Sequence, residues 1–181
     1  SSGALKLEPD GRIASCASWA FFTLLLKILG FLIRIASEKL EDDKANTYIK
    51  EAESIVDEAS TNLGTLNAEY FYYVGLIHTY KGDFEQARQN YEFSYKKSKE
   101  ENEPELLAKT LLALAQNSYN LQSFEKSLDY LNQLNQLLKI IKKYYLSGAM
   151  FLHSAKVFTE LEMYDKALEH FTLANRALQD K

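Results

Sequence analysis

A short motif recurs in this chain at a fixed spacing, and this repeat constrains the possible folds more than any other feature. Each copy has an aromatic residue, a small residue three positions later and a large residue four positions after that. The copies are Phe84, Ala87 and Tyr91, then Phe124, Ser127 and Leu131, then Tyr164, Ala167 and Phe171. Corresponding residues lie 40 positions apart in both steps. Such a period predicts an array of equivalent structural units.

Each motif follows an apolar segment, which predicts a second helix in every unit. These segments cover residues 70–77, 111–115 and 150–155. Within them Gly75, Ala115 and Ala155 occupy one equivalent position, where a small side chain lets two helices approach closely. The chain has two prolines and seven glycines in 181 residues, which disfavours a many-turned all-β fold. We therefore predict an all-α fold in which antiparallel helix pairs stack as a solenoid.

The order of large, apolar and small residues in each unit resembles the tetratricopeptide repeat (TPR) family. The residues that carry this resemblance are Phe71, Val74, Gly75, Ala87 and Tyr91 in the first unit, Leu111, Leu114, Ala115, Ser127 and Leu131 in the second, and Phe151, Ser154, Ala155, Ala167 and Phe171 in the third. The period of 40 residues is similar to that of the bacterial Rap-type peptide-pheromone receptors. The resemblance implies a TPR-like right-handed solenoid with a scaffold function. Residues 31–63 look like a fourth, degenerate unit.

These units suggest a division of the chain into five segments. The segments are an N-terminal stretch over 1–16 that could include part of a tag, an apolar helix plus the degenerate unit over 17–64, and three TPR-like repeats over 65–104, 105–144 and 145–181. Glycine, proline and capping side chains mark the expected helix boundaries. Helix ends are expected at Gly64, Gly82 and near Lys142, and helix starts at Asp83, Ser123 and Pro104.

The segment over 17–36 is apolar enough to resemble a membrane span, but Lys27 and Arg34 interrupt it. Together with Thr23, Gly30 and Glu38 they recur every three or four residues, as a narrow polar stripe on a helix does. We therefore favour a largely buried helix over a membrane or signal segment. The part over 19–36 could cap its own stack or dock onto a second copy, so a homo-oligomer remains an alternative.

Composition and motif content argue against several classes of function. A net charge of −4 argues against a dedicated nucleic-acid binder. One cysteine and three scattered histidines argue against a disulfide framework and a zinc site. The sequence contains no phosphate loop, serine elbow or HExxH motif. We therefore predict no catalytic residue, no metal, no cofactor and no enzymatic activity.

The TPR resemblance implies that the first helix of each unit lines a concave groove that holds a peptide or a protein segment. The inward-facing positions would be Tyr72, Leu76, Tyr80, Leu112, Gln116, Tyr119, Asn120, Leu152 and Lys156. Amide side chains can bond to a peptide backbone, and tyrosines offer contact area with few rotatable bonds. Residues at three positions do not match the carboxylate clamp of chaperone-binding TPR proteins. They are Tyr72, Leu76 and Ala113.

Three hypotheses about function follow from these observations. The first is a peptide- or protein-binding scaffold, the second is a Rap-like peptide sensor in signalling, and the third is self-assembly through the helix over 19–36. The lone cysteine and the lack of a standard signal peptide indicate a cytoplasmic protein. The sequence could also be part of a longer chain.

Overall fold

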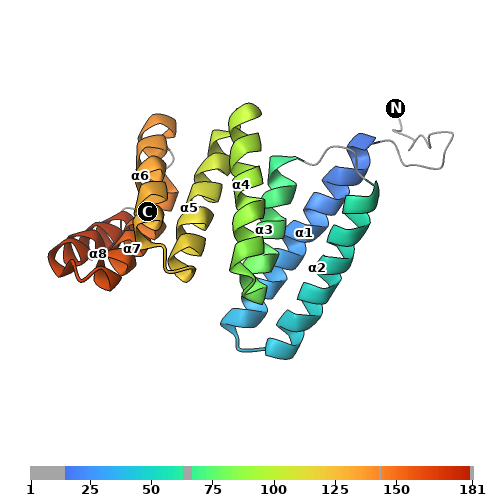
Figure 1. Ribbon diagram of the computed structural model, residues 1–181, viewed down its shortest axis with the longest axis horizontal. Helices are drawn as coiled ribbons and strands as arrows, with labels where there is room; N and C mark the ends of the chain where they lie inside the picture. The colour runs from blue at the N-terminus through green and yellow to red at the C-terminus, as the bar shows by residue number, and fades with distance from the viewer. Residues whose placement is uncertain (1–14, 63–66, 143, 180–181) are drawn as a thin grey trace.

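The computed structural model describes residues 15–62, 67–142 and 144–179, and within these ranges it contains helices but no β-strand. The helices are α1 (Ser15–Glu38), α2 (Asp42–Asn62), α3 (Ala68–Lys81), α4 (Phe84–Glu100), α5 (Pro104–Asn120), α6 (Phe124–Ile141), a short 3₁₀ helix η1 (Tyr144–Leu146), α7 (Ser147–Glu160) and α8 (Tyr164–Gln179). Consecutive helices form pairs that follow one another along the molecule (Figure 1). The predicted all-α solenoid of stacked helix pairs is confirmed.

The two helices of each pair are joined by a tight turn with one residue in a left-handed conformation. These residues are Leu40, Gly82, Gln122 and Glu162. The last three are 40 residues apart, whereas Leu40 precedes Gly82 by 42. The degenerate unit therefore begins earlier than the predicted residue 31, because the apolar helix α1 is its first helix and α2 is its second.

Several helix boundaries agree with the sequence, and two capping predictions do not. Gly82 ends α3 with φ of 82°, and α6 ends at Lys142, where φ is 54°. Asp83 and Ser123 precede α4 and α6, but neither side chain makes a capping hydrogen bond. Their ψ angles of 62° and 68° belong to the tight interhelical turn and not to an extended N-cap. Pro104 begins α5 as expected, and Gly64 lies outside the described residues.

Within a unit, the small residue of the first helix lets the large residue of the second approach. A Cβ atom at Gly75 would lie 2.6 Å from Cδ1 of Tyr91, so the tyrosine ring occupies the space that a side chain would need. Tyr91 is buried, and its hydroxyl lies 2.9 Å from Thr79 Oγ1 on the same helix as Gly75. The close packing predicted from the small residues is therefore present between α3 and α4.

The expectation that α1 is largely buried is wrong. Phe21, Leu24, Ile28 and Phe31 are between 47% and 58% exposed and form a stripe along one side of the helix. The opposite side is buried among α2 and α3, at residues that include Leu26. The difference has a simple cause: among the described elements α1 packs against α2 and α3, and neither of them covers this apolar face. By length and composition, residues Ala20–Glu38 also qualify as a candidate membrane span, with 39% of that window buried.

The polar stripe on α1 is only partly covered: Thr23 and Gly30 are buried, whereas Lys27, Arg34 and Glu38 are exposed. Lys27 Nζ is 3.8 Å from Glu69 Oε1, and Thr23 is buried. Gly30 sits beside Tyr73, whose Cδ1 would be 3.9 Å from an added Cβ. This side of α1 therefore faces α3, with room for a methyl group at Gly30.

Candidate functional site

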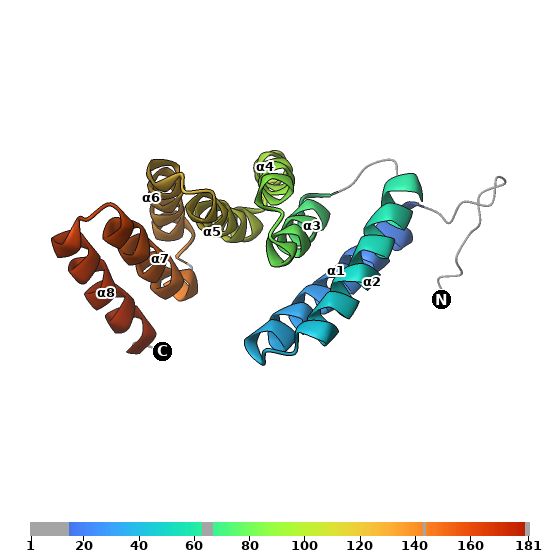
Figure 2. The same ribbon diagram turned by 60° about the horizontal axis from the view of Figure 1, so that its bottom comes forward.

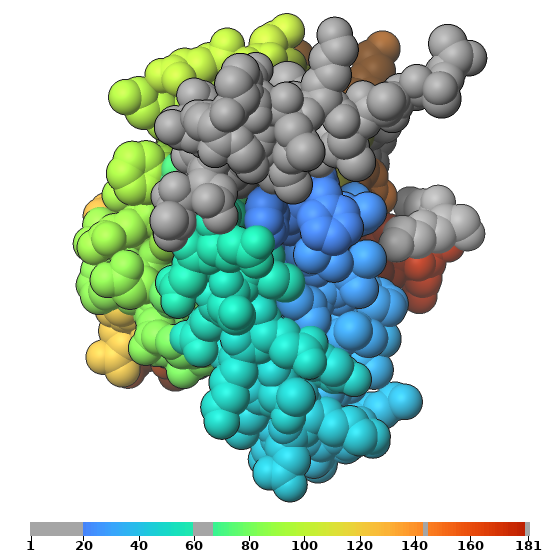
Figure 3. All heavy atoms as spheres, turned by 90° about the vertical axis from the view of Figure 1, so that its right-hand side faces the viewer, coloured from blue at the N-terminus to red at the C-terminus, as the bar shows by residue number. Residues whose placement is uncertain are grey.

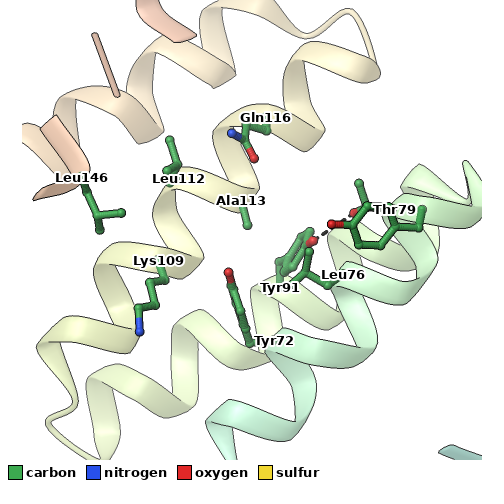
Figure 4. A pocket seen from close by; sticks show the side chains of 10 residues that line it. Tyr72, Leu76, Thr79, Tyr91, Lys109, Leu112, Ala113, Gln116 and Leu146 are labelled. Atoms are coloured by element: carbon green, nitrogen blue, oxygen red, sulfur yellow. Dashed lines mark hydrogen bonds between the residues drawn. The ribbon is translucent and has the colours of Figure 1, made fainter. Parts of the chain in front are cut away.

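The first helices of successive units border a hollow of about 250 Å³ between α3 and α5. Its lining comes from α3, α4, α5 and η1, so no single unit builds it (Figure 4). The lining residues are Tyr72, Leu76, Thr79, Tyr80, Tyr91, Lys109, Leu112, Ala113, Gln116 and Leu146. The helix pairs follow an arch in which α3, α5 and α7 lie toward the inner side (Figure 2).

Five of the nine side chains predicted from the sequence line this hollow. Tyr72, Leu76 and Tyr80 follow one another at intervals of four residues along α3, and Leu112 and Gln116 do so along α5. Residues four apart lie on one face of an α-helix, which is why the spacing predicts a common surface. The contact between α3 and α5 then brings the two rows to the same hollow.

The other four predicted residues lie beyond the hollow. Tyr119 of α5 contacts two residues of α7. Its hydroxyl donates a hydrogen bond to Glu160 Oε1 at 2.9 Å, and its ring packs edge-on against His153 with 5.4 Å between the ring centroids. Asn120 is exposed at the end of α5, and Leu152 and Lys156 are exposed on α7. These four residues therefore lie on α5 and α7 outside the hollow.

Besides Thr79 and Ala113, which lie on the predicted helices α3 and α5, three further lining residues were not among the nine predicted side chains. Tyr91 comes from the second helix of its unit, and the packing at Gly75 places its ring between α3 and the hollow. Leu146 belongs to η1, the link between the last two units, which a repeat pattern does not position. The sequence could have predicted Lys109 as a lining residue, because it lies three residues before Leu112 and hence on the same face of α5.

The hollow combines apolar walls with a small number of polar groups. The Tyr72 hydroxyl points into it, and the Lys109 ammonium lies at its edge (Figure 4). Burial raises the pKa of Tyr72, and the neighbouring Tyr73 and Tyr80 add to the effect. Burial likewise raises the pKa of Tyr91. Both phenols are therefore neutral at physiological pH, and Tyr72 can donate or accept a hydrogen bond in the hollow.

The described residues bring no metal-binding group together. Within 15–62, 67–142 and 144–179, no three His, Cys, Asp or Glu side chains lie close enough to hold an ion. The histidines occupy separate helices, α3, α7 and α8. The chemistry available at the hollow is thus apolar contact, hydrogen bonding through tyrosine and amide groups, and attraction of an anionic group by Lys109.

The free energy of unfolding should depend on pH because of His153, a buried histidine of α7. Burial lowers the pKa of His153, and the charge of Lys156 lowers it further, although a hydrogen bond with the Ala115 backbone acts in the opposite direction. Since unfolding returns the imidazole to its ordinary pKa near 6.5, the unfolded chain binds more protons below that pH. The free energy of unfolding should therefore fall as the pH is lowered from about 7 to about 5.

Urea denaturation at several pH values measures this effect, with His153→Gln as the test variant. His153→Gln should show a smaller loss of stability than the unmodified chain over the same pH interval. Part of the dependence should persist, because burial also lowers the pKa of His78 and of His170. An identical pH dependence in both proteins would contradict a role for His153.

Comparison with known proteins shows the fold but no close relative. No family model matches the chain, and no curated protein sequence matches it. The apo form of RapI superposes with a TM-score of 0.64 and 18% identity, over 86% of this chain and 56% of RapI. Aspartyl phosphate phosphatase F from Bacillus subtilis gives a TM-score of 0.63 and 13% identity, over 87% and 41% of the two chains.

A third structure is a signal transduction ATPase with a tetratricopeptide repeat sensor, from Pyrococcus horikoshii. It gives a TM-score of 0.62 and 18% identity, over 87% of this chain and 24% of that one. The chain thus spans a quarter to somewhat more than half of the length of these proteins. Its helix pairs have the TPR-like, Rap-type helical-repeat fold that the sequence predicts.

Proposed function

We propose that this protein is a non-enzymatic module of the cytoplasm that binds a short peptide or an extended protein segment in the hollow between α3 and α5. The observation that carries the proposal is the convergence there of Tyr72, Leu76, Leu112 and Gln116 from two successive units. A groove formed by successive repeats is the usual binding surface of a solenoid. RapI and the tetratricopeptide repeat sensor share this fold, which supports a protein or peptide as the partner.

The lining suggests the chemistry of the segment that would bind. An apolar side chain of the ligand would pack between Leu76 and Leu112, and the Gln116 amide would bond to its backbone. An acidic group of the ligand would lie near Lys109, whose ammonium is 3.7 Å from Glu105 and whose side chain is 42% exposed. We therefore expect a preference for peptides in which an apolar residue is followed or preceded by an acidic one.

A selection from displayed random linear peptides, followed by fluorescence anisotropy with the selected peptide, tests this proposal. Leu76→Glu should weaken binding at least about tenfold, because it introduces a charge where an apolar anchor would pack. Removing one hydroxyl in Tyr72→Phe should weaken binding about fivefold, as expected for one hydrogen bond. Replacing the cation in Lys109→Gln should reduce the preference for acidic peptides without abolishing binding of neutral ones.

The matched control is Ile140→Glu, since Ile140 is an apolar residue of α6 that is 76% exposed and lies away from the hollow. It should bind the selected peptide with unchanged affinity. Each variant should give the same circular dichroism spectrum as the unmodified chain, which shows that its fold is intact. Selected peptides that bind Leu76→Glu, Tyr72→Phe and the unmodified chain equally would show that the hollow is not the binding site.

A second candidate function is a peptide-responsive regulator, which the fold shared with RapI favours. In that case the ligand would change the pitch of the superhelix and not merely fill the hollow. Small-angle X-ray scattering with and without the selected peptide separates the two functions. A change in the radius of gyration on binding would favour the regulator, and an unchanged scattering profile with retained affinity would favour the scaffold.

A further inference from the structure

A cleft of about 340 Å³ lies between α2 and α3, where the degenerate unit meets the next unit. Two rows of side chains line it: Glu53, Val56 and Asp57 on α2, and Val74, Ile77 and His78 on α3. Each row has the spacing of neighbours on one helix face. The α3 row lies on the face opposite Tyr72, Leu76 and Tyr80, so the cleft and the hollow are separate surfaces of α3.

The cleft is present because α3 packs more extensively on α1 than on α2. Between α2 and α3, the long Tyr70 side chain reaches the Val56 carbonyl oxygen, which is 3.4 Å from its hydroxyl. At the equivalent place between α4 and α5 two short side chains meet, with 3.1 Å between Ser94 Oγ and Thr110 Oγ1. A long side chain thus spans α2 and α3 where two short ones span α4 and α5, which leaves room beside it.

The floor of the cleft is apolar. Val74 and Ile77 are 4% and 2% exposed and belong to the core that α1, α2 and α3 share. Val56 packs against that core but is only partly buried. Its equivalents in the next two units, Ser98 and Leu138, are each 1% exposed. An aliphatic chain placed in the cleft would therefore cover a position that the later units bury.

Helix α2, which forms one edge of the cleft, carries the whole net charge of the chain. It holds six acidic and two basic residues, whereas the rest of the chain holds 19 of each sign. In Figure 3 the residues of α2 lie between those of α1 and those of the α3–α4 pair. Two of its carboxylates, Glu53 and Asp57, line the cleft. The later units have Lys99 and Lys139 in place of Asp57, so the negative edge is specific to this junction.

Lys81 neutralises this edge only in part. Its ammonium donates a hydrogen bond to Glu53 and lies 3.1 Å from Asp83 Oδ2, so one cation serves two carboxylates. Nδ1 of His78 is buried and makes no hydrogen bond with the described residues, and Asp83 Oδ2 is 3.8 Å from it. The cleft therefore combines an apolar floor, an excess of negative charge and an imidazole ring.

We propose that this cleft binds an arginine side chain of a basic segment of a partner protein. The aliphatic part of the arginine would cover Val56, and the guanidinium would bond to Glu53 and Asp57. A guanidinium is planar and less strongly hydrated than an ammonium, and it can stack on a ring such as that of His78. We therefore expect arginine to be preferred over lysine. Because the cleft and the hollow lie on opposite faces of α3, each can be occupied without the other.

Proton NMR of the imidazole signals can locate the binding, because the chain has only three histidines. The probe is an acetylated and amidated peptide of nine arginines. It should shift the signal of His78, assigned with His78→Gln, and leave the signals of His153 and His170 unchanged. Fluorescence anisotropy with a labelled probe gives the affinity, and a peptide of nine lysines should bind at least about threefold more weakly.

Two variants change the cleft itself. Asp57→Lys introduces the residue that Lys99 and Lys139 provide in the later units, and it should weaken binding of the probe at least about tenfold. Val56→Phe fills the floor without changing the charge and should weaken binding about fivefold. The matched control is Glu51→Lys, which changes the net charge equally at an exposed position of α2 outside the cleft. It should bind within about twofold of the unmodified chain.

Five results would overturn the proposal. They are an unchanged His78 signal, equal affinities for arginines and lysines, and equal weakening by Glu51→Lys and Asp57→Lys, which would indicate attraction by net charge alone. A His78 signal that moves with calcium chloride and not with the probe would indicate a metal ion, and one that moves with protein concentration alone would indicate a second copy. Tyr72→Phe and Leu76→Glu, which change the hollow, should bind the probe normally, so the two proposals stand or fall separately.

Discussion

Replacing Gly75 by valine should lower the free energy of unfolding by about 3 kcal/mol, at the upper end of the usual cost of overpacking a core. A Cβ atom there would lie 2.6 Å from both Cδ1 and Cε1 of Tyr91. The ring is held in place, because Tyr91 is 1% exposed and its hydroxyl lies 2.9 Å from Thr79 Oγ1. Urea denaturation followed by circular dichroism at 222 nm, about the helical minimum, measures the change.

Gly30 of α1 provides the matched control. The nearest side-chain atom to a Cβ at Gly30 is Cδ1 of Tyr73 at 3.9 Å, an ordinary contact distance. Gly30→Ala should therefore raise stability by up to about 1 kcal/mol, since alanine favours a helix interior over glycine. The opposite outcome, with Gly75→Val harmless and Gly30→Ala disruptive, would contradict the packing of α3 on α4 described above.

Truncating Leu26 to alanine should lower the free energy of unfolding by about 3 kcal/mol, because the side chain leaves a cavity that its neighbours fill only in part. Leu26 is 0% exposed and lies in the core that α1 shares with α2 and α3. The matched variant is Leu24→Ala, on the same helix, where the leucine is 54% exposed. It should change stability by no more than about 0.5 kcal/mol.

The comparison should be repeated at two protein concentrations, because Leu24 lies on the exposed apolar side of α1, where association would add to the measured stability. Thermal denaturation and urea denaturation should agree in the order of the variants. Equal losses for Leu24→Ala and Leu26→Ala would mean that α1 is covered on both sides, as a fully buried helix would be. A loss at Leu24 alone would mean that the helix is rotated relative to the structure.

The repeat pattern was sufficient to predict the fold because its constraints are local and recur. Gly75, Ala115 and Ala155 recur every 40 residues, and each allows the two helices of a unit to approach. The turn at Gly82 and the start of α5 at Pro104 were likewise predictable, since backbone chemistry at single residues sets them. The predicted N-cap at Asp83 is wrong, because its carboxylate lies 3.1 Å from Lys81 Nζ and makes no capping hydrogen bond.

The candidate site was predictable only in part. Spacing by four residues is enough to place Tyr72, Leu76 and Tyr80 on one face of α3. Tyr91 and Leu146 reach the same hollow from α4 and η1, so their places depend on how successive units stack. A periodic pattern describes which residues share a helix face, but it does not describe which faces meet.

The sequence by itself determined the class of fold, the 40-residue period of the last three units and, on α3 and α5, which residues share the helix face that lines the hollow. Tertiary structure alone decided which side of α1 is covered. Its apolar residues surround most of the helix, and nothing in the pattern separates Leu24 from Leu26. The neighbours α2 and α3 make that choice: they bury Leu26 and leave Leu24 exposed, because burial depends on the helices that pack against a face and not on its hydrophobicity alone.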